Sequence, residues 1–367
     1  MAGGVGSRFW PMSIPERPKQ FIDVLGTGKT MIQLTVERFK GIIEPENVWV
    51  VTSKRYKDIV MKQLPEVPES HILMEPCMRN TAPCIAYASR KIYSRYPDAN
   101  LVFSPADHLV LDVPHFQDVV NESLRFTKDN DVILTLGMMP TRPETGYGYI
   151  KSVTSDNVGD IFKVEAFKEK PDITTAQSYL KQGGYFWNAG IFIWNVNMVI
   201  KTFNALVPEI SAVFDKVEPH FFKEDEQDVI DELFPTCPNI SIDYAVMEKS
   251  DNVFVYPADF GWSDIGTWAS LYTHIPADEQ KNAVIGENIR MVDSNNCIVR
   301  SFGREKVIVQ GLDNYIIIDD NNRLLICKMQ DEQLIKEWQK IKTKIKSKCS
   351  RHKSKNKVYY RKIWTER

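Results

Sequence analysis

Glycines and cations cluster at the start of the chain. Gly3-Gly4-Val5-Gly6-Ser7-Arg8 is followed by Pro18-Lys19-Gln20-Phe21. Glycines let a backbone approach phosphates closely and present N–H donors to them. Arg8 and Lys19 add two positive charges at a spacing that a loop could fold around a triphosphate. The run lacks the Gly-Lys-Ser/Thr of P-loop ATPases, and taken alone it is slightly better explained as a glycine-rich turn with surface cations.

Two aspartates are candidates for holding a hard cation. Asp107 directly follows an expected strand, and Asp264 lies in a Gly-Trp-Ser-Asp-Ile-Gly-Thr-Trp run between glycines and aromatics. Ligands of open α/β sheets bind beyond the carboxyl ends of strands, where an Asp carboxylate can hold Mg²⁺. Each Asp also fits a turn or a helix N-cap, and two isolated acids do not define a metal site by spacing alone.

Further along the chain, polar side chains suited to a phosphorylated sugar occur in otherwise structural runs. Glu169 can accept hydrogen bonds from sugar hydroxyls, and Lys170 can hold a phosphate as a point charge. Asn188 lies inside an apolar run, so its amide needs a backbone or ligand partner. Gly146-Tyr-Gly-Tyr-Ile150 is a turn where a backbone could approach a sugar. Each motif alone also fits a structural role, but their joint occurrence in this order favours a binding site.

The elements that must position these residues follow an α/β pattern in the first half of the chain. Apolar β-rich runs predict strands at 47–52, 71–74, 101–104 and 132–137, and helical periodicity predicts helices at 54–63, 81–96 and 115–128. This alternation predicts a doubly wound, mostly parallel sheet covered by helices on both faces. Further strands are predicted at 161–167 and 185–194, with helices at 174–181, 196–206 and 242–249.

The pattern changes near residue 276 to short strands and polar turns, including the Asn-Asn turns at 293–296 and 319–322, which hint at stacked β coils. We therefore predict a nucleotidyltransferase domain at 1–275 and a small β domain at 276–330. A helix and a basic tail follow at 331–367. Eleven Lys/Arg and one acid from Lys342 onward predict a largely disordered tail.

Composition excludes several classes of protein. The 367 residues are 43% hydrophobic and 26% charged, which is ordinary for a globular protein with a core. The net charge of −2 contains +10 from the tail, which leaves an acidic body of −12 and does not suggest nucleic-acid binding. No apolar run is long enough for a membrane span. Six cysteines scattered singly fit a cytoplasmic protein with reduced thiols.

Taken together, the motifs resemble those of the mannose-1-phosphate guanylyltransferase family within the sugar nucleotidyltransferases. The matching runs extend from Ala2–Arg8 to Gly261–Trp268 and cover most of residues 1–275. Between these ends the matches are Pro18–Phe21, Glu75-Pro76, Arg79–Pro83, Pro105–His108, Gly146–Ile150, Glu169–Pro171, Trp187–Gly190 and Ile242–Lys249. The Arg79–Pro83 and Trp262–Trp268 runs point to the guanylyl–mannose branch.

The resemblance implies a Rossmann-like nucleotidyltransferase domain followed by a short left-handed β-helix-like domain. Its substrates would be GTP and mannose 1-phosphate. It implies that the GTP phosphates contact Gly3, Gly4, Gly6, Ser7, Arg8 and Lys19, and that the guanine lies near Glu75, Arg79, Asn80 and Thr81. Mannose 1-phosphate would contact Gly148, Glu169, Lys170, Asn188 and Asp243, and Mg²⁺ would bind Asp107 and Asp264. The sequence does not determine the oligomeric state, and a homodimer is one possibility.

The implied reaction needs no general base, because the attacking phosphate of mannose 1-phosphate is already an anion. Catalysis would rest on positioning and on charge neutralisation by Mg²⁺, Arg8 and Lys19. Two alternatives stay open: another sugar nucleotidyltransferase, using glucose 1-phosphate with UTP or ATP, and an inactive nucleotide-sugar-binding homologue. The chain is too short to add a phosphomannose isomerase domain.

The start of the chain departs from the family pattern. Relatives carry an apolar strand before the glycine-rich loop, whereas Gly3 here follows only Met1 and Ala2. We therefore expect Met1 to be an internal methionine of the natural protein. A chain without that strand should be weakly active and of lowered melting temperature, and an apolar segment added before Met1 should restore both.

Overall fold

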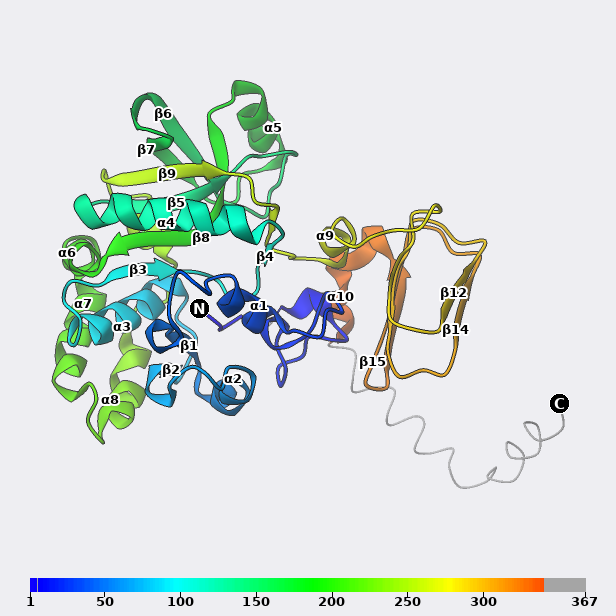
Figure 1. Cartoon of the computed structure of the whole chain (residues 1–367), viewed down its shortest axis with the longest axis horizontal. Coiled ribbons are helices and arrows are strands. Elements are labelled where there is room, and N and C mark those ends of the chain that lie inside the picture. Colours follow the sequence, from blue (N-terminus) through cyan, green and yellow to red (C-terminus); the bar gives the residue numbers. More distant parts are fainter. Residues whose placement is uncertain (5, 340–367) are drawn as a thin grey trace. The chain divides into compact units, whose positions relative to one another are not determined.

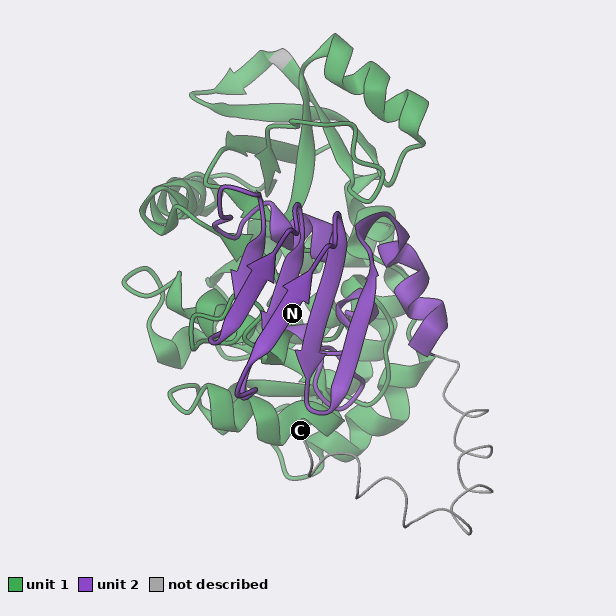
Figure 2. Ribbon diagram, turned by 90° about the vertical axis from the view of Figure 1, so that its right-hand side faces the viewer, with its two compact units in different colours: residues 1–4, 20–265 green, residues 5–19, 266–367 purple. Residues whose placement is uncertain are grey.

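The computed structural model describes residues 1–4 and 6–339, so the predicted disordered tail lies outside the described residues. The described chain forms two compact units (Figure 2). The first contains residues 1–4 and 20–265, and the second contains the loop 6–19 together with residues 266–339. The glycine-rich run is therefore divided, with Gly3 and Gly4 in one unit and Gly6 onward in the other.

A six-stranded sheet dominates the first unit, in the order β3-β8-β5-β9-β7-β6 (Figure 1). The strands are β3 (Asn100–Phe103), β5 (Ile133–Met138), β6 (Tyr149–Val158), β7 (Ile161–Lys168), β8 (Tyr185–Asn195) and β9 (Val253–Ala258). The prediction of a mostly parallel sheet is wrong for this sheet. Only β5 and β9 pair in parallel among its described strands, and every other pairing is antiparallel.

One antiparallel pairing, that of β6 with β7, arises from a connection that contains no helix. β6 and β7 form a hairpin whose turn contains Gly159 at a φ of +61°, a conformation that glycine adopts without strain. β8 then runs antiparallel to β3, β5 and β6. The sequence prediction placed a helix between most strands and did not include β6, which led it to crossover connections and a parallel sheet.

Two smaller sheets complete the strands of the first unit. β1 (Val50–Ser53) and β2 (Ile72–Glu75) are parallel, whereas β4 (Leu109–Val110) and β10 (Trp262–Ser263) are antiparallel. Of these short strands, β2, β4 and β10 each begin or end beside candidate site residues.

Helices cover both faces of the large sheet. The helices that share its two cores are α3 (Thr81–Tyr93), α4 (Val113–Asp129), α5 (Ile173–Gln182), α6 (Val196–Leu206), α7 (Pro208–Val217) and α8 (Glu226–Leu233). The helices α1 (Met31–Glu37) and α2 (Lys57–Gln63) pack with β1 and β2 instead. In β8, Phe192 and Trp194 pack in the core that contains α3 and α6, while Ile191 and Ile193 pack in the core that contains α4. This period-two alternation buries both faces. The predicted helix at 242–249 is instead a π-helical turn, Asp243–Met247.

The second unit is a small β structure. β11 (Ala283–Ile285), β13 (Ile298–Ser301), β15 (Tyr315–Asp320) and β16 (Arg323–Lys328) form one sheet, and β12 (Ile289–Val292) pairs with β14 (Val307–Gln310). Strands of successive turns pair in parallel, as stacked coils do, up to β15. The Asn321–Asn322 turn instead closes an antiparallel hairpin, with φ of 45° and 62°. The short helices α9 (Trp268–Tyr272) and α10 (Ile335–Trp338) flank the sheets in the sequence.

No helix in the described ranges combines the length and apolar character that crossing a bilayer requires.

Candidate active site

The two candidate metal ligands lie on neighbouring backbone segments. β4 and β10 pair antiparallel, with Ser263 opposite Leu109. One residue beyond this ladder, Asp264 comes opposite His108, so Asp107 and Asp264 are carried at the same end of the pair. Tyr147 Oη donates a hydrogen bond to Asp264 Oδ1 at 2.7 Å. The structure thus pairs the backbone segments next to two acids that are far apart in the sequence.

Arg38 holds the loop that carries Asp107. Its guanidinium donates to three acceptors of that loop: Ser104 Oγ at 2.8 Å, Pro105 O at 3.2 Å and His108 O at 3.2 Å. Burial lowers the pKa of Arg38 to about 10, and the negative charge of Asp107 opposes that shift. Because these three hydrogen bonds reach residues on both sides of Asp107, Arg38 fixes the loop that carries this carboxylate.

A cavity of about 200 Å³ lies beside Asp264. Asn188 lines this cavity. Its Nδ2 donates to Asp243 Oδ1 at 3.0 Å, and its Oδ1 accepts from Gly190 N at 3.0 Å. The Asn188 amide is thus satisfied within the protein. Burial raises the pKa of Asp243 to about 6, and the negative charge of Glu169 adds to the shift. Two neighbouring carboxylates in a small cavity suit a polyhydroxylated ligand, because they accept hydrogen bonds from hydroxyl groups.

Gly148 leaves room for Glu169 in the same cavity. A Cβ at Gly148 would lie 2.6 Å from Glu169 Oε2 and 3.3 Å from the Phe167 ring. Lys170 Nζ contacts Glu169 Oε1, and its side chain is 61% exposed. A lysine that is this exposed can turn toward an anion, whereas the Glu169 side chain, only 10% exposed, is held inside.

The four residues predicted near the guanine extend from the last residue of β2, Glu75, to the first residue of α3, Thr81. Glu75 is buried, and burial raises its pKa to about 7. Arg79 Nη2 donates to Pro235 O. Asn80, at φ 61°, precedes α3 and donates to Asn239 Oδ1 at 2.7 Å. Thr81 Oγ1 accepts from the Ile242 backbone N–H at 2.8 Å.

Two of these four line cavities that are also lined by residues predicted to contact mannose 1-phosphate. Thr81 lines the 200 Å³ cavity together with Asn188 and Asp243. Asn80 lines an adjoining cavity of about 340 Å³ with Lys170 and Asp243. A role for all four in binding guanine stays a prediction.

The loop of the second unit holds the candidate catalytic cations. Gly6 adopts φ 59°, and a Cβ there would lie 2.7 Å from Lys19 Cβ. Lys19 is buried, with Nζ 5.6 Å from the centroid of the Phe9 ring. Arg8 Nε donates to Gln333 Oε1 at 3.0 Å, and Gln339 Nε2 donates to Ser7 O. Contacts of Arg8, Lys19, Gly6 and Ser7 with GTP phosphates stay predictions.

Gly3 and Gly4 lie in the first unit, where no described atom comes within 4 Å of a Cβ built on either. Open space around their backbone is compatible with the predicted approach of a phosphate.

Sequence reasoning missed two residues that shape the site. Arg38 lies in no motif, and only its place at the end of α1 beneath the Asp107 loop shows its role. Tyr147 lies within a recognised glycine turn, but the bond of its hydroxyl to Asp264 joins positions 117 residues apart. Within the described residues, no cluster of three or more His, Cys, Asp or Glu side chains forms a preassembled metal site.

Comparison with known proteins places this geometry in a family. The family model described as nucleotidyl transferase matches residues 1–281. A mannose-1-phosphate guanylyltransferase of Klebsiella pneumoniae is 33% identical over 360 residues, which cover 96% of this chain and 75% of that protein. The chain belongs to the mannose-1-phosphate guanylyltransferase family of nucleotidyl transferases. It is therefore an enzyme of this type, as predicted.

Other relatives agree with this placement. The mannose-1-phosphate guanylyltransferase RfbM of Salmonella typhimurium is 36% identical, with 92% of this chain and 70% of RfbM covered. The alginate biosynthesis protein AlgA of Pseudomonas fluorescens is 35% identical at the same coverage. A crystal structure described as mannose-1-phosphate geranyltransferase from Thermus thermophilus superposes with a TM-score of 0.84 at 28% identity, covering 93% of this chain and 97% of that one. The α/β nucleotidyltransferase fold is thus confirmed.

Proposed function

We propose that the protein transfers GMP from GTP to α-D-mannose 1-phosphate, giving GDP-mannose and pyrophosphate. The observation that carries the proposal is the small cavity in which Asn188, Asp243 and Glu169 converge beside Asp264. Membership of the family supplies the reaction class, and the cavity supplies a place for the sugar. We also propose that the parallel coils of the second unit are a short left-handed β-helix.

The mannose hydroxyls would be recognised by the acidic cavity. Glu169 and Asp243 accept hydrogen bonds there, and Lys170 turns its exposed ammonium to the sugar phosphate. Because Gly148 lacks a side chain, Glu169 Oε2 can lie directly over the Gly148 backbone. The cavity of about 200 Å³ admits one sugar ring rather than a nucleotide.

Mg²⁺ would be held by Asp107 and Asp264. Protein-bound Mg²⁺ typically uses one or two carboxylates together with waters and substrate phosphates, so the two acids at one end of the β4–β10 pair fit this ion without a third protein ligand. The buried Arg38 and the hydroxyl of Tyr147 orient the loop and the second carboxylate. When bound, the ion would neutralise charge on the phosphates.

In the reaction, a phosphate oxygen of mannose 1-phosphate attacks the α-phosphorus of GTP in line. The new P–O bond forms as the bond from the α-phosphorus to the bridging oxygen of the β-phosphate breaks, and pyrophosphate carries away that electron pair. No proton has to be removed from the nucleophile. Arg8 and Lys19 neutralise the developing charge on the triphosphate.

The test is pyrophosphate release with Mg²⁺ and a matrix of GTP, ATP and UTP against mannose 1-phosphate and glucose 1-phosphate. We expect kcat/KM for GTP with mannose 1-phosphate to exceed every other pair by at least tenfold. Preference for UTP or ATP with glucose 1-phosphate would favour another sugar nucleotidyltransferase. Binding of GDP-mannose without turnover of any pair would favour an inactive binding homologue.

A further inference from the structure

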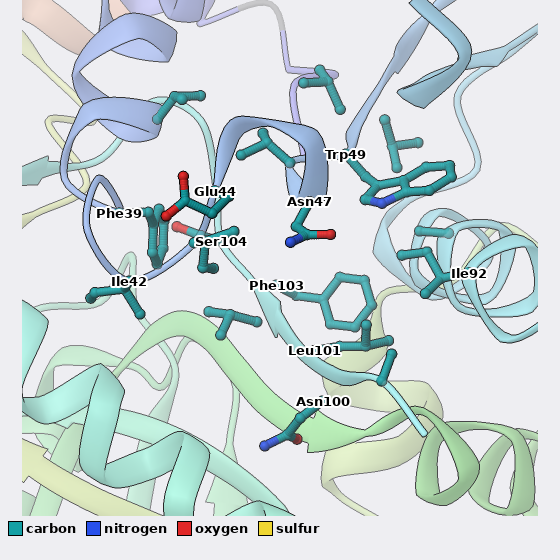
Figure 3. Close-up of a pocket in the computed structure, with 18 of the residues that line it drawn as sticks. Phe39, Ile42, Glu44, Asn47, Trp49, Ile92, Asn100, Leu101, Phe103 and Ser104 are labelled. Carbon is teal, nitrogen blue, oxygen red and sulfur yellow. The ribbon is translucent and has the colours of Figure 1, made fainter. Parts of the chain in front are cut away.

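The first unit contains two cavities of different chemistry. One, of about 760 Å³, lies between β1 and β3 and is lined mainly by apolar side chains, among them Phe39, Ile92 and Phe103 (Figure 3). The other is the proposed sugar cavity of about 200 Å³, and its wall contains Trp262 and His108. The proposed reaction uses neither of these two side chains, although each lies within two residues of a candidate metal ligand.

The register of β4 and β10 brings the side chains of Trp262 and His108 together. Trp262 lies opposite Val110 in this antiparallel pair, and His108 is two residues before Val110. Residues directly opposite one another share a face of the ladder, as do residues two apart, so Trp262 and His108 are diagonal neighbours on one face. Gly261, at φ 64°, precedes Trp262, and a Cβ there would lie 2.8 Å from Leu111 Cβ. A glycine at this position therefore allows β10 to approach the chain beyond β4 closely.

A hydrogen bond joins the two rings and assigns the roles of both His108 nitrogens. Trp262 Nε1 lies 3.3 Å from His108 Nδ1, and the ring centroids are 5.3 Å apart in an edge-to-face contact. An indole N–H can only donate, so His108 Nδ1 is the acceptor and carries no proton. In the neutral ring the proton is then on Nε2. That nitrogen lies 3.8 Å from Asp107 Oδ1, so the N–H of the imidazole is on the side of the first acid.

The ring of Trp262 also supports the donor to the second acid. Its centroid lies 5.2 Å from that of Tyr147 in an edge-to-face contact, and the ring of Trp187 packs against Tyr147 at 5.3 Å. Tyr147 is buried, and its hydroxyl donates to Asp264 Oδ1 at 2.7 Å. Because two indole rings pack against it, the phenol ring has little freedom to turn away from the carboxylate.

Packing alone does not explain why a tryptophan occupies position 262. Trp187 and Trp194 each bury an indole nitrogen that has no hydrogen-bond partner among the described residues, so only their rings are used. Trp262 differs from them, because its N–H donates to His108. Phenylalanine could supply an aromatic ring at this position, but it could not orient the imidazole.

We propose that Trp262 is a positioning residue for both candidate metal ligands. Its N–H orients His108 with Nε2 toward Asp107, and its ring holds the Tyr147 hydroxyl at Asp264. One side chain thus joins the supports of two acids from distant parts of the sequence, so that both carboxylates are oriented before a metal binds. The effect on metal binding rests on the proposed function, whereas the hydrogen bond between Trp262 and His108 does not.

Matched substitutions in the full chain separate the N–H from the ring. Trp262→Phe keeps an aromatic ring and removes the N–H. Trp187→Phe is the control, because it makes the same change in the other indole that packs against Tyr147, whose nitrogen has no partner in the described part of the chain. His108→Phe removes the acceptor of the same bond, so the test does not depend on the folding of one variant. Thermal unfolding is recorded for each protein.

The first readout is the tautomer of the His108 ring, measured by two-bond ¹H–¹⁵N NMR of histidine-labelled protein without metal or substrate. The His108 signals are those missing from His108→Phe. We expect Nδ1 to carry no proton in the unsubstituted chain and in Trp187→Phe, and its ¹⁵N resonance to move in Trp262→Phe. A proton on Nδ1 in the unsubstituted chain would overturn the proposal, as would an Nδ1 resonance that does not respond to Trp262→Phe.

The second readout is metal affinity, measured with Mn²⁺ alone by electron paramagnetic resonance of the unbound ion, so that no turnover is needed. Substitution of residues that orient metal ligands typically costs about 10- to 100-fold in affinity. We therefore expect Trp262→Phe and His108→Phe each to raise the Kd for Mn²⁺ about tenfold, the double variant to be no weaker than either, and Trp187→Phe to change it less than about threefold.

An unchanged Kd in both Trp262→Phe and His108→Phe would overturn the positioning role, even with the expected tautomer. An equal loss in Trp187→Phe would also overturn it, because ring packing would then account for the effect. A chain that binds Mn²⁺ as expected but turns over no pair of nucleotide and sugar phosphate would count against the proposed function and not against the role of Trp262.

Discussion

Gly148→Ala should damage sugar binding while leaving the fold intact. The new methyl carbon would lie 2.6 Å from Glu169 Oε2, and ordinary contact begins at 3.4 Å, so the carboxylate must move by about 0.8 Å. Oε2 is the far end of a flexible side chain, and Gly148 does not have a positive φ. Neither feature opposes folding, and replacing Gly by Ala at a compatible site typically stabilises by about 0.4–1 kcal/mol.

The functional cost should be much larger. Misplacement by about 1 Å can reduce a rate about 100-fold, so we expect kcat/KM for mannose 1-phosphate to fall roughly 10- to 100-fold. KM for GTP should change less than threefold. The assay is steady-state pyrophosphate release with each substrate varied, alongside thermal unfolding of the same preparations.

A double-mutant cycle with Glu169→Ala isolates the cause. If Gly148→Ala acts by displacing Glu169, it should add little to the loss once the carboxylate has been removed. Gly146→Ala is the matched control, because its Cβ would meet only Glu144 Oε1, at 3.2 Å. Losses that add fully in the double variant would refute the reasoning, as would an equal loss in Gly146→Ala.

Three other substitutions probe separate parts of the account. Asp264→Ala should abolish turnover while the protein still folds, because the carboxylate removed is the one proposed to hold the metal; a near-normal rate would contradict the metal assignment. Lys170→Ala should raise KM for mannose 1-phosphate, and a selective loss of GTP affinity would show that the two sites are reversed. Glu75→Gln tests whether burial of the Glu75 carboxyl makes the stability of the protein depend on pH. Since the pKa of Glu75 is raised from 4.5 to about 7, the native protein should lose up to about 3 kcal/mol between pH 5 and 8. In the variant this loss should disappear, as measured by urea unfolding at each pH.

Local elements of this fold could be predicted where one periodicity governs the segment. The apolar spacing of 81–96 predicts α3, and that of 115–128 predicts α4, with ends within about three residues of Thr81–Tyr93 and Val113–Asp129. The strand at 101–104 is confirmed as β3, shifted by one residue. In each of these segments, the face that must be buried is encoded within the segment itself.

Strand direction could not be predicted, because it depends on which distant strands pair. β8 pairs with β3, β5 and β6, and no local pattern in Tyr185–Asn195 encodes those partners. In the candidate site, too, local motifs could be predicted, whereas contacts between distant residues could not. Glycine, acid and cation motifs mark Asp264 and Glu169, but the three hydrogen bonds from Arg38 to the Asp107 loop exist only in the folded chain.

The central claim is a single in-line displacement at the α-phosphorus of GTP by mannose 1-phosphate. It is tested most directly with GTP carrying a chiral thiophosphate at that phosphorus, followed by configurational analysis of the sugar nucleotide product. One direct attack predicts inversion of configuration, with no nucleotide left on the protein. Retention of configuration, or a covalent nucleotidyl-protein, would contradict the account.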